Sequence, residues 1–208
     1  DDTWTKIEEI IEKGKAELKQ SRIRGVSFSR NFGKEAAILA GLANATGEAC
    51  VVMDCDMQHP PETLVEMYRL WQEGYEVVEG VKRTRGKESL VYKSSAKLFY
   101  RLMSKATGID MSRASDFKLM DRKVVKSILS MPERNMFFRG LSSWVGFKKT
   151  EVEFDVRERE FGTSKWSKWS LVKYAVKNIA AFSTVPMQLV TIAGALTLLG
   201  AVILGIQT

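Results

Sequence analysis

The chain has 208 residues, 45% of them hydrophobic and 27% charged, and a formal net charge of +7. This length allows one globular domain of ordinary size with a small appendage, and the absence of internal repeats or low-complexity tracts excludes a repeat architecture. The two cysteines, Cys50 and Cys55, lie too close together on one predicted strand and turn to form a disulfide framework. Their spacing fits a reducing compartment.

The first half of the chain predicts alternating helices and strands. Helices are expected over residues 4–18, 33–43, 61–72 and 89–105, and strands over 23–28, 49–53 and 76–81. Such alternation is typical of an α/β fold with a mostly parallel sheet, helices on both faces, and ligands at the carboxyl ends of the strands.

After Ser115 the predicted elements become shorter. Strands are expected over 116–120 and 147–156, and helices over 122–131 and 135–144. The last strand is expected to pair antiparallel.

The most apolar stretch of the chain, residues 186–206, contains no charged residue. At about 1.5 Å per residue, a helix of roughly 20 residues crosses a bilayer core of about 30 Å. The stretch therefore predicts a transmembrane helix, with a buried core helix as the alternative. Basic residues precede it and none follows, so the positive-inside rule predicts that the large domain lies on the cytoplasmic side of the cell membrane.

Residues 165–185 alternate aromatic and apolar side chains with lysines at helical spacing. The pattern predicts an amphipathic helix in the headgroup region, and a surface helix packed on the domain is the alternative. We therefore expect a domain over 1–164, a juxtamembrane helix over 165–185 and a transmembrane helix over 186–206. Anionic lipid, and not nucleic acid, is the expected partner of the lysine cluster, which consists of Lys165, Lys168, Lys173 and Lys177.

Two carboxylates one residue apart follow the predicted strand 49–53. Side chains alternate with period two, so Asp54 and Asp56 should lie on the same side of the chain, with Gln58 continuing the series. Carboxylate and amide oxygens suit Mg²⁺ or Mn²⁺, which keep open positions for the oxygens of a diphosphate. The alternative is a strand-to-helix turn with acidic caps, since short motifs match by chance.

A longer string, D-C-D-M-Q-H-P-P-E at residues 54–62, resembles the family 2 (GT-A) glycosyltransferases, and within them the polyprenyl-phosphate glycosyltransferases. This group includes dolichol-phosphate mannose synthases and bacterial undecaprenyl-phosphate glucosyltransferases. Residues 29–35 (S-R-N-F-G-K-E), 115–122 (S-D-F-K-L-M-D-R) and 157–166 (R-E-R-E-F-G-T-S-K-W) resemble further blocks of that family in the expected order. The resemblance implies a Rossmann-like GT-A domain.

The same resemblance implies roles for individual residues in transfer from a nucleotide sugar. A divalent ion on Asp54, Asp56 and Gln58 would neutralise the leaving diphosphate. Arg30 and Asn31 would line the nucleotide pocket, and the family implies a mobile donor and acceptor loop over 157–166. Further donor contacts on that loop are then Arg159 and Lys165.

Asp116 matches the family's candidate base position and, with Asp56, is the expected catalytic residue. A lipid monophosphate has a second pKa of about 6 and is already largely ionised at pH 7, so it has little need of a base. Asp116 is then expected to orient the acceptor or to bind a cationic neighbour. The alternative is a helix or strand cap.

The acceptor phosphate requires fixed cations at the same sheet edge. Lys82 stands where the family usually has arginine, and Arg85 follows it; Ser164 adds a hydroxyl from the loop over 157–166. The only histidine, His59, is expected to be a hydrogen-bond partner in the turn rather than a metal ligand.

The resulting prediction is an inverting hexosyltransferase that uses a nucleotide sugar, UDP-glucose first, and a polyprenyl phosphate. Homo-oligomerisation is left open. Alternatives are a processive synthase of the same family, which would carry a Q-x-x-R-W motif absent here, and a catalytically silent membrane scaffold. Compared with the family, the chain is expected to be a fragment that lacks the first strand before residue 1 and a second membrane helix after Thr208.

Overall fold

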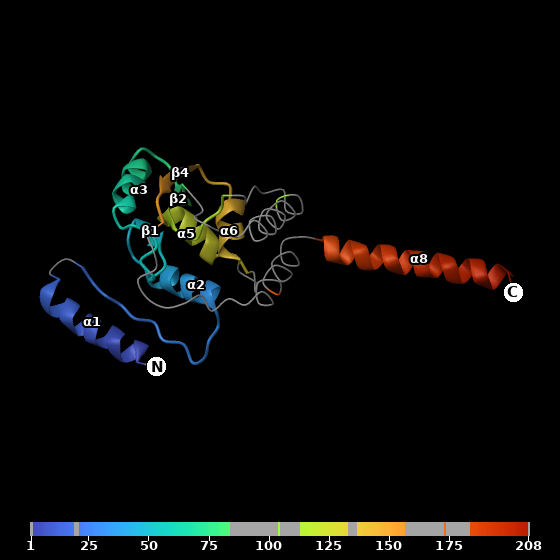
Figure 1. Cartoon of the computed structure of the whole chain (residues 1–208), viewed down its shortest axis with the longest axis horizontal. Coiled ribbons are helices and arrows are strands. Elements are labelled where there is room, and N and C mark those ends of the chain that lie inside the picture. The colour runs from blue at the N-terminus through green and yellow to red at the C-terminus, as the bar shows by residue number, and fades with distance from the viewer. Residues whose placement is uncertain are drawn as a thin grey trace. The chain divides into compact units, whose positions relative to one another are not determined.

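The computed structural model describes residues 2–18, 21–83, 104, 113–132, 137–156, 173 and 184–207. The chain divides into two compact units, Asp1–Thr46 and Gly47–Thr208. Figure 1 shows the elements in chain order. The predicted helix 89–105, apart from Ser104, and most of the predicted helix 165–185 lie outside the described residues. The predicted domain limits therefore stay predictions.

The first unit contains two of the predicted helices, α1 (Thr3–Glu17) and α2 (Lys34–Asn44). The segment between them packs back on α1 at Gly25, where a Cβ atom would lie 2.9 Å from the Ile7 side chain. The strand predicted over residues 23–28 is wrong, because the structure has neither strand nor helix there. A strand requires a hydrogen-bonded neighbour, and no backbone ladder joins these residues to another described segment.

The second unit is built on a four-stranded sheet of order β1-β3-β2-β4. Its strands are β1 (Ala49–Val52), β2 (Val77–Lys82), β3 (Lys118–Asp121) and β4 (Lys149–Phe154). The predicted fold class, an α/β sheet flanked by helices, is confirmed. The described sheet is nevertheless mixed, because β3 lies between β1 and β2 and is antiparallel to both.

The direction of strand β4 differs from the prediction. It was predicted to pair antiparallel, but it pairs parallel to β2 over the whole of both strands. Apolar alternation reports which face of a strand is buried and carries no information on the direction of its neighbour. The antiparallel strand of this sheet is β3.

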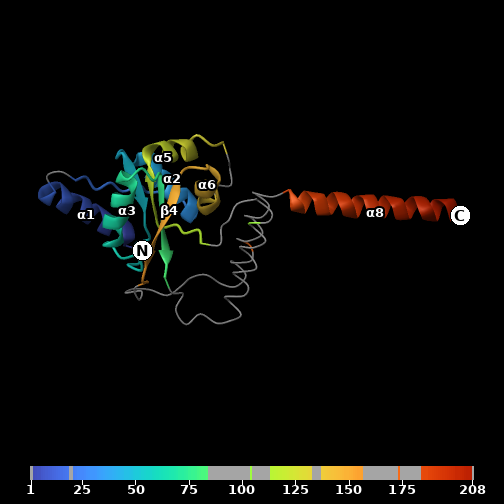
Figure 2. The same cartoon turned by 90° about the horizontal axis from the view of Figure 1, so that it is seen from above.

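Helices cover both faces of this sheet. Helix α3 (Thr63–Gln72) lies on one side, and α5 (Arg122–Leu129) and α6 (Phe138–Trp144) lie on the other (Figure 2). All three correspond to predicted helices, with ends that differ by up to three residues. Asp121 begins α5, because its side chain accepts the Lys123 backbone N–H at 2.9 Å.

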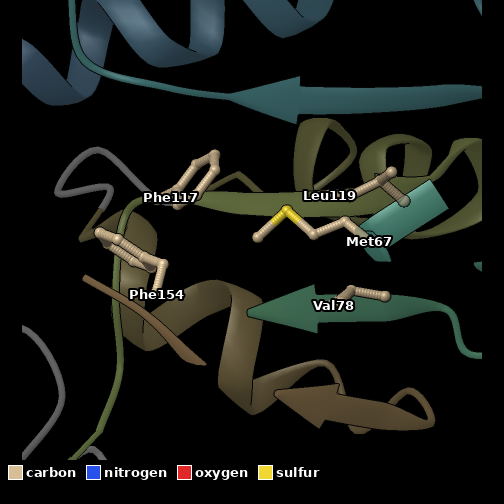
Figure 3. Packing of buried hydrophobic residues seen from close by; sticks show 5 residues of the cluster. All are labelled: Met67, Val78, Phe117, Leu119 and Phe154. Carbon is tan, nitrogen blue, oxygen red and sulfur yellow. The ribbon is translucent and has the colours of Figure 1, made fainter. Parts of the chain in front are cut away.

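The core on the α3 side of the sheet is a cluster of five buried side chains (Figure 3). Met67 of α3 lies against β2 and β3, and the rings of Phe117 and Phe154 pack together at one end of the cluster. The ring centroids of Phe117 and Phe154 are 5.3 Å apart in an edge-to-face arrangement. The cluster consists of Met67, Val78, Phe117, Leu119 and Phe154.

Gly80 leaves room for this cluster. A Cβ atom at position 80 would lie 2.3 Å from the Phe117 ring and 2.9 Å from Cε of Met67. We expect Gly80→Ala to lower the free energy of unfolding by about 1–3 kcal/mol, the usual cost of overpacking a core. Urea unfolding in detergent measures it. Gly41→Ala in α2 is the control. Apart from the helix's own backbone and the two chain neighbours, no atom of the described residues lies within 4 Å of a Cβ there, so stability should be unchanged or slightly higher. Unchanged stability of Gly80→Ala would contradict the prediction.

The stretch predicted to span a membrane forms one helix, α8 (Val185–Gln207). Among the described residues, its segment Met187–Ile206 is the one long and apolar enough to cross a bilayer. Its large side chains are exposed; Met187, for example, is 75% exposed and Ile206 80%. The predicted helix is confirmed, and its insertion in a membrane stays a prediction.

Candidate active site

The register of β1 and β3 brings the predicted metal and catalytic residues to one end of the sheet. Val52 pairs with Lys118 in the last pair of this ladder. Asp54 and Asp116 each lie two residues beyond that pair, so both leave the sheet at the same end. Strands β2 and β4 also end there, at the pair Lys82 and Phe154. Parallel strands therefore deliver their carboxyl ends to the edge where ligands bind in α/β sheets.

The turn after β1 alternates half-buried and exposed residues. Asp54, Asp56 and Gln58 are half-buried, whereas the residues between them, Cys55 and Met57, are exposed. The Gln58 backbone N–H donates to Oδ1 of Asp56 at 3.2 Å, and Met57 takes a left-handed φ of 60°. The turn thus extends the strand's alternation past the end of the ladder.

The side chains at this turn fit a hard divalent cation. Two carboxylates and one amide supply only oxygen atoms, the ligands that Mg²⁺ and Mn²⁺ prefer. No three His, Cys, Asp or Glu side chains gather into a metal cluster in the described ranges. A third protein ligand at this turn would therefore be the amide oxygen of Gln58.

His59 joins this turn to the core. Its Nδ1 accepts the Asp54 backbone N–H at 3.4 Å, and its ring stacks on Phe117 with centroids 4.6 Å apart. The residue is 7% exposed. The prediction that His59 is a hydrogen-bond partner in the turn is confirmed. Phe117 follows Asp116 in the sequence, so this stacking joins the turn after β1 to the segment that carries Asp116.

Asp116 binds a guanidinium that the sequence analysis did not identify. Nε of Arg139 donates to Oδ1 of Asp116 at 2.8 Å, and Nη2 donates to Oδ2 at 2.7 Å. The side chains are 9% exposed for Asp116 and 29% for Arg139. Such a bidentate pair is among the stronger polar contacts in proteins. The expectation that Asp116 binds a cationic neighbour is therefore confirmed.

A second ion pair lies deeper, between Lys118 of β3 and Glu79 of β2. Nζ of Lys118 is 2.6 Å from Oε1 of Glu79, and it donates to Oγ of Ser142 on α6, also at 2.6 Å. Burial lowers the pKa of the Lys118 ammonium, although the nearby Glu79 carboxylate acts in the opposite direction. Sequence analysis missed this pair as well as Arg139.

A signal for these residues was nevertheless present. Glu79 and Lys118 are opposite charges within two apolar strands, V-V-E-G-V and F-K-L-M, and Arg139 interrupts the apolar run F-F-R-G-L. A charge in a buried segment requires a partner, because its desolvation is costly otherwise. The partners themselves could not be assigned, since they come from elements 23 to 39 residues away.

The remaining predicted site residues fall into three groups. Arg30 and Asn31 belong to the first unit, where the Arg30 guanidinium lies 4.7 Å from the Phe32 ring centroid and Oδ1 of Asn31 accepts the Gly33 N–H at 2.9 Å. Lys82 is exposed at the end of β2. The third group lies outside the described residues and consists of Arg85, Arg159, Ser164 and Lys165.

Comparison with known proteins shows the family of the chain. Residues 1–129 match the model of the family described as glycosyl transferase family 2. The chain belongs to glycosyltransferase family 2. It is 46% identical to the uncharacterized glycosyltransferase YkcC of Bacillus subtilis over 176 residues, which are 84% of this chain and 54% of that protein. The family resemblance seen in the sequence is thereby confirmed.

Two further similarities extend the comparison. The chain is 39% identical to the bactoprenol glucosyl transferase of Shigella phage SfX, over 81% of this chain and 56% of that protein. Among solved structures, mannosyl-3-phosphoglycerate synthase from Rubrobacter xylanophilus is 18% identical with a TM-score of 0.43, over 72% of this chain and 50% of that one. The chain spans about half the length of the curated relatives it matches.

Proposed function

We propose that this glycosyltransferase moves a hexose from a nucleotide sugar, UDP-glucose first, to a polyprenyl phosphate. The observation that carries the proposal is that Asp54, Asp56 and Asp116 all leave the sheet at the same end. The similarity to a bactoprenol glucosyl transferase supports the choice of glucose and of a lipid phosphate. The proposed reaction is inverting, with one sugar transferred per acceptor.

The oxygen-rich turn is the proposed diphosphate site. Asp54, Asp56 and Gln58 would hold Mg²⁺ or Mn²⁺, which supplies Lewis-acid stabilisation of the charge on the leaving diphosphate. Both carboxylates are half-buried, and the Asp56 side chain is held by the Gln58 backbone N–H. Arg30, Asn31, Arg159 and Lys165 are the further donor contacts that we propose.

Asp116 has a different proposed task from that of a general base. Its carboxylate accepts two hydrogen bonds from Arg139, and an ionised lipid phosphate has no proton that must be removed. We assign to Asp116 the orientation of Arg139 at the edge of the acceptor site. Lys82, Arg85 and Ser164 are the proposed contacts of the acceptor phosphate.

The proposed location is the cytoplasmic face of a cell membrane. From Leu189 to Ile206, helix α8 leaves its leucine, isoleucine and valine side chains exposed, and covering each of them contributes about 1.5–3 kcal/mol. A bilayer core covers them all without a partner protein. The lysines at 165, 168, 173 and 177 precede the helix, which favours a cytoplasmic domain and attraction to anionic lipid.

A transfer assay tests this function. Purified protein in detergent is incubated with undecaprenyl phosphate and labelled UDP-glucose, UDP-galactose, UDP-N-acetylglucosamine or GDP-mannose, with Mn²⁺ or with EDTA. We expect labelled lipid from UDP-glucose with Mn²⁺ and its loss with EDTA, because the diphosphate charge is then left uncompensated. A water-soluble polymer would instead indicate a processive synthase. No product from any donor would contradict transfer and favour a scaffold.

A further inference from the structure

A buried ammonium lies between the sheet and helix α6. The Lys118 side chain is 0% exposed and its partner, the Glu79 side chain, is 3% exposed. Removing two charges from water is costly, and an apolar pair of similar volume is often at least as stable. Stability alone therefore does not account for this ion pair. Its further hydrogen bond to α6 suggests a role in positioning that helix.

The second contact of Lys118 reaches α6. Its Nζ donates to Oγ of Ser142, whose hydroxyl lies 3.2 Å from the backbone oxygen of Arg139. Helix α6 has only seven residues, F-R-G-L-S-S-W, and includes a glycine and two serines. So short a helix with so low a propensity is held by tertiary contacts rather than by its own hydrogen bonds.

Two contacts attach α6 to β3 and to the residues just before it. Asp116 and Lys118 are two residues apart, and their side chains reach the same helix. Arg139 and Ser142 are three residues apart and therefore lie on one side of α6. The outer contact, between Asp116 and Arg139, lies at the site edge, and the inner contact, between Lys118 and Ser142, is buried behind it.

We infer that Lys118 is a positioning residue for the outer contact. Glu79 holds the Lys118 ammonium in place, the ammonium holds Ser142, and α6 is thereby fixed at the height and rotation at which Arg139 meets Asp116 with two hydrogen bonds. The consequence for catalysis rests on the proposed function, whereas the geometry of the Arg139 pair is measured independently of any reaction.

The test compares matched variants of the whole chain. Ser142→Ala removes the hydroxyl that Lys118 binds, and Ser143→Ala removes a neighbouring buried hydroxyl that has no hydrogen-bond partner among the described residues. Glu79→Leu with Lys118→Met removes both charges and keeps the volume. Lys118→Met alone leaves the Glu79 carboxylate buried without its partner, so it serves as the variant that loses thermal stability.

The first readout is the NMR signal of the Arg139 side-chain Nε–Hε group, assigned by its loss in Arg139→Lys. In the native protein and in Ser143→Ala, we expect one sharp signal that exchanges slowly with solvent, because Nε donates to Asp116. In Ser142→Ala and in the double variant, we expect a broadened, fast-exchanging signal. The second readout is transfer: kcat should fall about 10²-fold, as expected when a site group moves by about 1 Å, with KM for the donor little changed.

The outcomes are distinguishable. Thermal stability that recovers in the double variant, without recovery of the Arg139 signal or of kcat, supports a positioning role. A native Arg139 signal in both Ser142→Ala and the double variant would overturn the inference. If the double variant does not fold, the comparison of Ser142→Ala with Ser143→Ala decides. If the native protein transfers no sugar, the proposed function fails and the NMR comparison still decides the inference.

Discussion

Asp56→Asn is expected to lower kcat for sugar transfer by about 10² to 10³-fold, the usual cost of losing one electrostatic stabiliser of a developing charge. The asparagine amide oxygen can still accept the Gln58 N–H that Asp56 accepts at 3.2 Å, so the turn is retained while one negative charge is lost. Binding of Mn²⁺, measured by the loss of its free EPR signal, should weaken in parallel. Raising the Mn²⁺ concentration should restore part of the activity.

Cys55→Ser is the control for this experiment. Cys55 lies between the two carboxylates but is exposed, whereas Asp54 and Asp56 are half-buried. Its substitution should leave Mn²⁺ binding and transfer within about twofold of the native values, because surface changes have small effects. Native Mn²⁺ binding in Asp56→Asn would remove Asp56 from the proposed metal site, whatever its rate of transfer.

Arg139→Met is expected to lower the free energy of unfolding by about 3 kcal/mol, the lower end of the range for breaking a buried ion pair. The lower end applies because Arg139 is 29% exposed, whereas the Asp116 carboxylate that it leaves behind is 9% exposed. Urea unfolding measures this change. Transfer should fall about 10²-fold as well, since the acceptor site then loses the guanidinium that Asp116 orients.

Companion variants separate charge from geometry at this pair. Arg139→Lys keeps the positive charge but cannot form two parallel hydrogen bonds, so its stability and activity should be intermediate. Asp116→Asn combined with Arg139→Met should recover stability without activity, because no unpaired charge stays buried. Arg113→Met, which breaks an exposed pair with Glu151 and Glu153, should cost less than about 1 kcal/mol. Equal costs for Arg113→Met and Arg139→Met would contradict this account.

Local sequence patterns were a reliable guide to the elements that are self-contained. Helices α1, α2, α3 and α5 follow from apolar spacing, and the turn after β1 keeps the period-two alternation that was expected of Asp54, Asp56 and Gln58. The uncharged stretch predicted the helix α8. In each case the physical cause lies within a few neighbouring residues. The same patterns failed at residues 23–28, where a strand depends on a neighbour that local sequence does not specify.

The candidate site shows the same division. Asp54, Asp56 and Asp116 could be nominated from motifs, because their residue types and their place after apolar segments are local properties. Arg139 could not be nominated as the partner of Asp116, nor Ser142 as that of Lys118, since 23 and 24 residues separate these pairs. Such contacts depend on where α6 packs, which the short sequence of that helix does not report.

Residue types and their spacing were thus sufficient for the family and for most helices and strands, and they place the oxygen side chains of the proposed metal site on the turn after β1. Strand order, the antiparallel direction of β3 and the two ion pairs beneath the site came only from the folded chain. The reason is physical: side-chain periodicity reports burial along one segment, whereas pairing and charge compensation are satisfied between segments far apart in sequence. Asp116 illustrates both cases: the sequence motif identified the residue, whereas its partner Arg139 was identified only from the structure.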